Sequence, residues 1–133
     1  MKVLVLEDDE GVGGIIAACL EKWRQEATLV HDGQAAWDSL QSTSYDLLIT
    51  DWQVPSLSGT ELVKRLRQTP AYRKLPVLMI SGRAGKGDIV EAVQVGINGF
   101  LTKPFTPAQL RDKIASVWKS RNRITLDQAI QQI

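Results

Sequence analysis

Side chains capable of phosphate and metal chemistry follow four short apolar runs of this sequence, at Glu7, Asp8, Asp9, Asp51, Ser81 and Lys103. Carboxylates held close together raise one another's pKa and destabilise a fold unless cations balance them. The ammonium group of Lys103 supplies one positive charge, and a hard cation bound through oxygen atoms supplies more. Mg²⁺ suits such a cluster, because it accepts a few carboxylates and leaves room for phosphate oxygens. With one histidine and one cysteine in the chain, a zinc site is disfavoured.

The chemistry that these groups could perform together is phosphoryl transfer to a carboxylate. A carboxylate can attack phosphorus and form an acyl phosphate, while a metal ion and a cation neutralise charge on the equatorial oxygens. Asp51 is the best candidate nucleophile, because it is the single acid after its run. Asp8 and Asp9 are then candidate metal ligands, Lys103 pairs with the phosphoryl group, and the Ser81 hydroxyl can donate to it.

The segments that must position these side chains alternate between strand-like runs and helical patterns. The strand-like runs are Lys2–Leu6, Ala27–Val30, Tyr45–Thr50, Pro76–Ile80 and Gly99–Thr102. Continuous apolar positions within them are typical of strands covered on both faces, as in a parallel sheet. Segments with apolar stripes of helical period separate the runs, so the pattern predicts an α/β domain with helices on both faces of the sheet. In such sheets, functional residues gather beyond the carboxyl ends of the strands.

Composition excludes several other classes. The formal net charge of +1 gives no strong field toward nucleic acid or an anionic membrane, which disfavours DNA binding by this chain alone. No apolar stretch approaches the ~20 residues of a transmembrane helix, and the N-terminal run is too short for a secretory signal. The single cysteine, Cys19, excludes an internal disulfide. We therefore expect a cytoplasmic protein.

Four segments carry a resemblance to a known family: Val5–Asp9, Asp46–Gly59, Pro76–Gly82 and Gly99–Phe105. Each is weak alone, but together, in this order and at strand ends, they are a strong signal. The chain resembles the receiver domains of two-component response regulators, most of all the single-domain chemotaxis type, over residues 2 to about 120. The resemblance implies a flavodoxin-like (βα)5 doubly wound fold with a five-stranded parallel sheet in the order 2-1-3-4-5.

The resemblance also implies a role for each matching residue. Asp51 matches the phosphoacceptor, and Mg²⁺ (or Mn²⁺) is held by Asp8, Asp9, Asp51 and the backbone carbonyl of Gln53. Lys103 matches the lysine that pairs with the phosphoryl group, and its bond to Pro104 is expected to be cis. Ser81 and Phe100 match the switch hydroxyl and the switch aromatic residue. Gln53 and Arg83 occupy the positions that tune phosphoryl lifetime.

The function implied is that of a phosphorylation-controlled interaction module. A histidine kinase, a phosphotransfer protein or a small phosphodonor would supply the phosphoryl group. The face built from the fourth helix, fifth strand and fifth helix would then change its affinity for a downstream protein, a fused output domain or a second copy of the chain. The chain would catalyse only its own phosphorylation and dephosphorylation.

Three alternatives share parts of this pattern. An Asp-nucleophile, Mg²⁺-dependent phosphatase needs a second aspartate two residues after the nucleophile, where this chain has Gln53. A flavodoxin-like FMN carrier needs a hydroxyl-rich loop after the first strand, where this chain has acids. A receiver that acts as a constitutive scaffold is disfavoured by the complete set of site residues. Glu7 is interpreted as an acid near the site without a ligand role.

Two further segments are interpreted from local pattern alone. The stretch Lys64–Arg67 is interpreted as a solvated helix face. Residues 1–120 form the receiver domain and 121–133 a C-terminal extension, in which Thr125 and Gln128 fit a capping box at the start of a short helix. This extension is either a helix that lies on the domain, or the start of a linker or a dimer contact.

Overall fold

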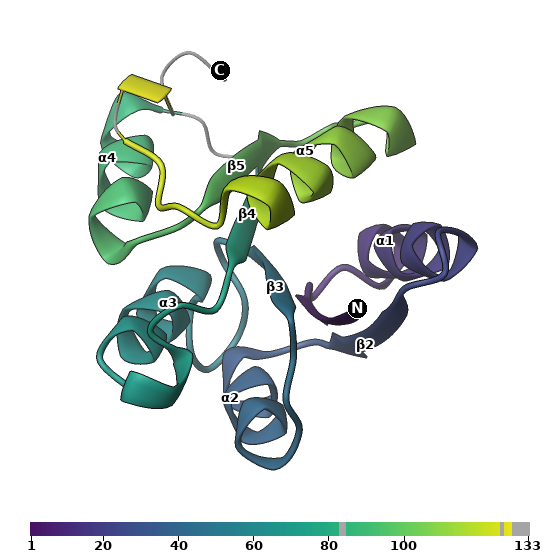
Figure 1. Ribbon diagram of the computed structural model, residues 1–133, viewed down its shortest axis with the longest axis horizontal. Coiled ribbons are helices and arrows are strands. Elements are labelled where there is room, and N and C mark those ends of the chain that lie inside the picture. Colours follow the sequence, from purple (N-terminus) through teal and green to yellow (C-terminus); the bar gives the residue numbers. More distant parts are fainter. Residues whose placement is uncertain (83–84, 126, 129–133) are drawn as a thin grey trace.

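The computed structural model describes residues 1–82, 85–125 and 127–128, and strands alternate with helices along the chain (Figure 1). The strands are β1 (Lys2–Leu6), β2 (Glu26–Val30), β3 (Leu47–Asp51), β4 (Val77–Ser81) and β5 (Gly99–Thr102). The helices are α1 (Glu10–Lys22), α2 (Gly33–Ser42), α3 (Gly59–Arg67), α4 (Lys86–Val95) and α5 (Pro107–Ser120), with a 3₁₀ turn, η1 (Pro70–Tyr72). The predicted alternation is confirmed, with shifts of one or two residues at strand ends.

The strands form one parallel sheet in the order β2-β1-β3-β4-β5, as the sequence predicts. Successive side chains of a strand point to opposite faces, so each strand contributes to two cores. Leu4 and Leu6 of β1 join the core under α2, α3 and α4, whereas Val3 and Val5 join the core under α1 and α5. Burial on both faces explains why the strands are apolar at consecutive positions.

Side-chain caps mark where the helices begin. Asp9, Asp32 and Ser58 accept hydrogen bonds from backbone N–H groups in the first turns of α1, α2 and α3. Thr106 and Gln109 form a reciprocal capping box at the start of α5, directly before the proline that occupies its first turn. Each cap satisfies N–H groups that have no partner within the helix. The caps therefore fix the points at which the loops leave the sheet.

The chain turns back toward the domain after α5. Arg121 adopts a left-handed conformation at φ 54°, and the N–H of Ile124 donates to the carbonyl of Ile97 at 3.2 Å. The expected capping box is present, because Thr125 and Gln128 exchange hydrogen bonds of 2.9 and 3.2 Å. The rest of the predicted terminal helix, Leu126 and 129–133, lies outside the described residues. In the part of the chain that is described, no helix has the length and apolarity to cross a membrane.

Candidate functional site

The carboxyl ends of the three strands β1, β3 and β5 bring an ion-paired cluster together. The ammonium group of Lys103, directly after β5, donates to Oδ2 of Asp51 at 2.8 Å and to Oε2 of Glu7 at 2.9 Å. These residues are 52 and 96 positions apart along the chain, respectively, from Lys103. The parallel sheet therefore places three strand ends at one edge, as expected for this fold class.

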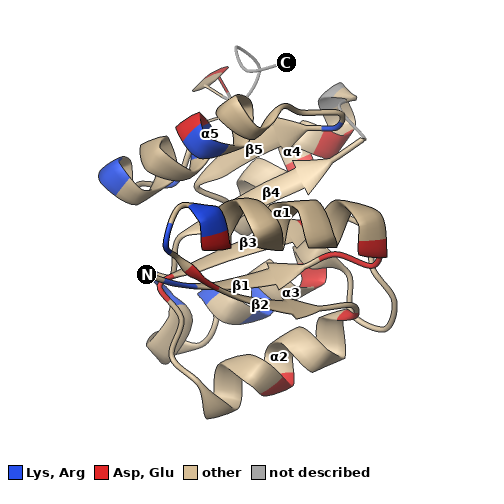
Figure 2. Cartoon of the chain, turned by 90° about the vertical axis from the view of Figure 1, so that its right-hand side faces the viewer, with Lys and Arg blue, Asp and Glu red and all other residues tan. Residues whose placement is uncertain are grey.

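The acidic part of this cluster consists of Glu7, Asp8 and Asp51. Each of the three offers a carboxylate oxygen, and these oxygens all lie within 4.8 Å of one another. Figure 2 shows in red the acids 7–9 in the loop between β1 and α1 and Glu10 at the start of α1. Hard cations such as Mg²⁺ prefer carboxylate ligands of this kind. The donor set therefore fits a divalent cation.

Asp9 lies outside this group, although the sequence pairs it with Asp8 as a candidate metal ligand. Helix α1 begins at Glu10, so Asp9 occupies the N-cap, where its Oδ1 accepts from the N–H of Val12 at 3.1 Å. Glu7 takes its place in the cluster. Its backbone N–H continues the sheet by donating to Val30, and its side chain is buried. The sequence predicts Glu7 as an acid near the site without a ligand role, and its contact with Lys103 places it beside Asp8 and Asp51.

Burial sets the electrostatics of Glu7. The pKa of this carboxyl is raised to about 7, and desolvation by burial is the largest cause. The hydrogen bond from Lys103 lowers the pKa, whereas the negative charge of Asp51 raises it further. Burial lowers the pKa of Lys103, but the hydrogen bonds that Lys103 makes to Asp51 and Glu7 have the larger combined effect. The pKa of Lys103 is therefore raised. The lysine therefore stays charged while Glu7 carries a proton below neutral pH. A bound cation would favour the charged form of Glu7.

The raised pKa of Glu7 predicts a pH dependence of stability in EDTA. The folded state binds more protons than the unfolded state between pH 4.5 and about 7, so the free energy of unfolding falls as the pH rises through this window. We expect a fall of up to about 3 kcal/mol. Glu7→Gln should flatten the curve, as measured by urea unfolding at pH 5, 6, 7 and 8. Parallel curves for the two proteins would contradict the assignment.

The backbone around Asp51 holds its carboxylate in place. Oδ1 accepts from the N–H of Trp52 at 2.6 Å, and Oδ2 accepts from Lys103. The following loop folds back over the strand end, where the N–H of Gly59 donates to the carbonyl of Trp52 at 2.8 Å. A Cβ atom at position 59 would lie 2.1 Å from the carbonyl oxygen of Asp51, so only glycine fits this close approach. The side chain of Asp51 remains partly exposed, so a molecule from solvent can reach its carboxylate.

The other predicted residues lie at or near the same edge. Ser81 ends β4 and is buried, and its carbonyl accepts from the N–H of Lys103 at 2.9 Å. Phe100 lies in β5 with its ring buried, whereas Gln53 is exposed in the loop after β3. The peptide bond before Pro104 is cis, as expected. Arg83 falls outside the described residues.

Comparisons with known proteins all point to the same protein family. The sequence pattern of the response regulator receiver domain matches residues 3–115. A chemotaxis protein CheY homolog from Campylobacter jejuni is 35% identical over 119 residues, which cover 88% of this chain and 92% of that protein. Chemotaxis protein CheY of Pseudomonas aeruginosa is 35% identical over 123 residues, 92% of this chain and 99% of that protein.

Solved structures agree with the sequence relatives. The chemotaxis response regulator CheY4 of Vibrio cholerae superposes with a TM-score of 0.83 at 29% identity, covering 87% of this chain and 97% of that one. The receiver domain of a sensor histidine kinase from Pseudomonas aeruginosa gives a TM-score of 0.82 at 29% identity, covering 90% and 98%. That structure is described with a magnesium ion coordinated in its active site cleft.

The match spans most of the chain, and the sheet order and the contact between Lys103 and Asp51 are those that the four sequence segments predict. This family acts in signalling as a phosphoacceptor rather than as a metabolic enzyme. The chain belongs to the response regulator receiver domain family and is related to the CheY proteins of chemotaxis.

Proposed function

We propose that this protein accepts a phosphoryl group on Asp51 in a Mg²⁺-dependent reaction. The observation that carries the proposal is the contact of Asp51 with Lys103, next to the cluster of Glu7, Asp8 and Asp51. Asp8 and Asp51 would bind the cation, together with the backbone carbonyl of Gln53, and Mn²⁺ could replace Mg²⁺. The buried Glu7 would add charge close to the metal. When bound, the cation would neutralise phosphoryl oxygens.

The side chains of the site would each have a distinct role in phosphoryl transfer. An oxygen of Asp51 forms a bond to phosphorus while the bond between phosphorus and the donor breaks, and the bonding electrons leave with the donor. The ammonium group of Lys103 lies 2.8 Å from this carboxylate, so it can follow the charge onto the phosphoryl oxygens. Glu7 remains its second partner. The hydroxyl of Ser81 would donate to a phosphoryl oxygen.

The second part of the proposal concerns how phosphorylation of Asp51 would change a surface of the domain. Movement of Ser81 would draw Phe100 further inward and change the face formed by α4, β5 and α5. The donor would be a histidine kinase or phosphotransfer protein, and the receiving partner a downstream protein, a fused output domain or a second copy of the chain. Gln53 and Arg83 would tune the lifetime of the acyl phosphate. A cytoplasmic location stays part of the proposal.

The proposal treats residues 1–120 as the receiver unit and 121–133 as an extension. The contact between Ile124 and Ile97, together with the packing of Ile124 against the core, supports an extension that lies on the domain. This arrangement would place the segment after α5 beside the loop that leads into β5. A change in that loop on phosphorylation would then reach the extension directly.

Intact mass spectrometry after incubation with acetyl phosphate and Mg²⁺ tests the acceptor. We expect the wild-type chain to gain the mass of one phosphoryl group, and Asp51→Asn to gain none. Omission of Mg²⁺ should also prevent the gain. A gain in Asp51→Asn would place the acceptor elsewhere. No gain in any sample with Mg²⁺ binding intact would point to a domain that needs its own kinase, and no gain without Mg²⁺ binding would favour a constitutive scaffold.

A further inference from the structure

A basic pocket lies at the opposite edge of the sheet from Asp51. Its volume is about 550 Å³, and it is lined by Arg67, Arg73, Lys74, Arg121 and Arg123 together with two asparagine side chains. Arg73 and Lys74 precede β4, and Asn98 precedes β5, so the pocket borders the amino ends of these strands. Among the described residues, no carboxylate lines it. Five cations therefore share one pocket without an acid.

Arg67 forms the floor of this pocket and is not the solvated side chain that the sequence predicts. It follows the buried Leu66 at the end of α3, and its guanidinium group reaches under η1 and the loop before β5. It donates to Asn98 Oδ1 at 2.9 Å and to the carbonyls of Gly96, Tyr72, Arg73 and Leu75 at 2.8 to 3.2 Å. All of these acceptors are neutral. The positive charge is thus held in place but not neutralised.

A second guanidinium group approaches the first. A Cβ atom built on Gly96 would lie 3.2 Å both from Nε of Arg67 and from Cζ of Arg123, so both groups border the same point. Burial lowers the pKa of Arg67 to about 10, and the charge of Arg123 contributes to that shift. Two guanidinium groups that border the same point repel each other, and an anion between them would relieve that repulsion. The side chains of Arg73, Lys74, Arg121 and Arg123 are exposed, so an anion in the pocket can reach them from solvent.

We propose that this pocket binds the di- or triphosphate group of a small molecule. Five cations within one pocket favour a ligand that carries several negative charges in a small volume, and a single carboxylate supplies only one. Arginine presents a planar fork of N–H donors that matches phosphate oxygens in pairs. Arg67 supplies charge from the floor, because most of its donors are already used. The exposed side chains supply the hydrogen bonds.

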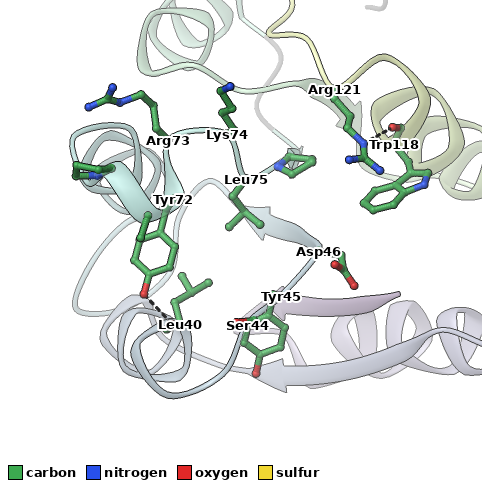
Figure 3. Close-up of a pocket in the computed structure, with 13 residues that line it drawn as sticks. Leu40, Ser44, Tyr45, Asp46, Tyr72, Arg73, Lys74, Leu75, Trp118 and Arg121 are labelled. Carbon is green, nitrogen blue, oxygen red and sulfur yellow. Dashed lines mark hydrogen bonds between the residues drawn. The ribbon is translucent and has the colours of Figure 1, made fainter.

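An adjoining pocket offers room for the rest of such a ligand. It has a volume of about 490 Å³ and shares Arg73, Lys74 and Arg121 with the basic pocket (Figure 3). Arg121 lies over the ring of Trp118, with its guanidinium carbon 3.8 Å from the ring centroid. Figure 3 places Tyr45 and Tyr72 on the far side of the same opening. Aromatic surface beside a phosphate site suits a ligand with a planar ring.

The site is separate from the phosphoacceptor. Strand β4 has five residues, which span about 15 Å at the usual rise per residue, and the pocket and Asp51 lie toward opposite ends of the sheet. Occupancy of the pocket therefore does not require Asp51 or a metal ion. The proposal also stands apart from the phosphoacceptor role, because none of its residues takes part in that role.

Isothermal titration of the full chain with pyrophosphate, at low ionic strength and in EDTA, tests the proposal. We expect saturable binding of one pyrophosphate per chain. The double variant Arg73→Gln/Lys74→Gln should weaken it about tenfold or more, because two charged hydrogen-bond donors are lost. The control Lys22→Gln/Arg111→Gln makes the same charge change at exposed sites outside the pocket and should stay within about twofold. Asp51→Asn should bind like the wild type.

Circular dichroism and thermal unfolding establish that the variants are folded before binding is compared. Equal weakening in both double variants would show general attraction to positive charge and would overturn the proposal. Loss of binding in Asp51→Asn would place the anion at the phosphoacceptor and would overturn it too. Binding of a poly-glutamate peptide in the absence of pyrophosphate binding would assign the pocket to an acidic protein segment and reject a phosphate ligand.

Discussion

Replacing Asp8 by asparagine is expected to weaken Mg²⁺ binding by about 100-fold or more, because it removes a charged ligand from the cluster of Glu7, Asp8 and Asp51. The same replacement at Asp9 should weaken it by less than about threefold. Asn caps a helix about as well as Asp, so the hydrogen bond from the N–H of Val12 should survive in Asp9→Asn. The two variants carry the same change of charge at neighbouring positions, so they form a matched pair.

Isothermal titration with MgCl₂ measures both affinities, and phosphorylation by acetyl phosphate should follow the same order. Asp9→Ala extends the comparison, because loss of the cap should lower the free energy of unfolding by about 1 kcal/mol while Mg²⁺ affinity stays close to that of Asp9→Asn. If Asp9→Asn lost as much Mg²⁺ affinity as Asp8→Asn, the N-cap would not be the only role of Asp9. That result would support the pair of metal ligands predicted from the sequence, Asp8 and Asp9.

The different places of Asp8 and Asp9 in the structure have a local physical cause. Glu7, Asp8 and Asp9 are consecutive acids, and their types do not reveal which side chain faces the cleft. The geometry decides it, because β1 continues its hydrogen bonding through the N–H of Glu7 and α1 begins at Glu10. The position of Asp9 directly before a helical segment was an available signal, since aspartate is among the preferred N-cap residues.

The fold followed more readily from the sequence than the side-chain contacts did. Continuous apolar runs such as Val3–Leu6 indicated strands buried on both faces, and the parallel sheet confirms this. That sheet also brings Asp51 to Lys103, as predicted. Arg67 could not be assigned in the same way, because four of its five partners are backbone carbonyls. Backbone acceptors leave no pattern in the sequence, so a charged residue at the end of α3 looks solvated until the chain around it is known.

Replacing Arg67 by methionine should lower the free energy of unfolding by about 3 kcal/mol, because several partly buried acceptors would lose a charged donor. Five acceptors on η1, the segment before β4 and the loop before β5 would lose their shared donor. Methionine keeps an apolar stem of similar length, so the loss is chiefly that of the hydrogen bonds. Urea unfolding in EDTA at pH 7 measures the effect.

Arg67→Met also removes the repulsion between Arg67 and Arg123, which acts in the opposite direction. The sizes of the two effects decide the sign of the change. Two cations beside solvent repel by roughly 1 kcal/mol or less, whereas each hydrogen bond from a charged donor contributes about 1.5 to 3 kcal/mol. The lost hydrogen bonds therefore win even though water replaces some of them. Arg65→Met is the matched control, since Arg65 is exposed and lies 5.0 Å over the Trp37 ring, a contact worth about 0.5 to 1 kcal/mol. Equal losses for the two variants would mean that the Arg67 hydrogen bonds contribute no more than a surface contact.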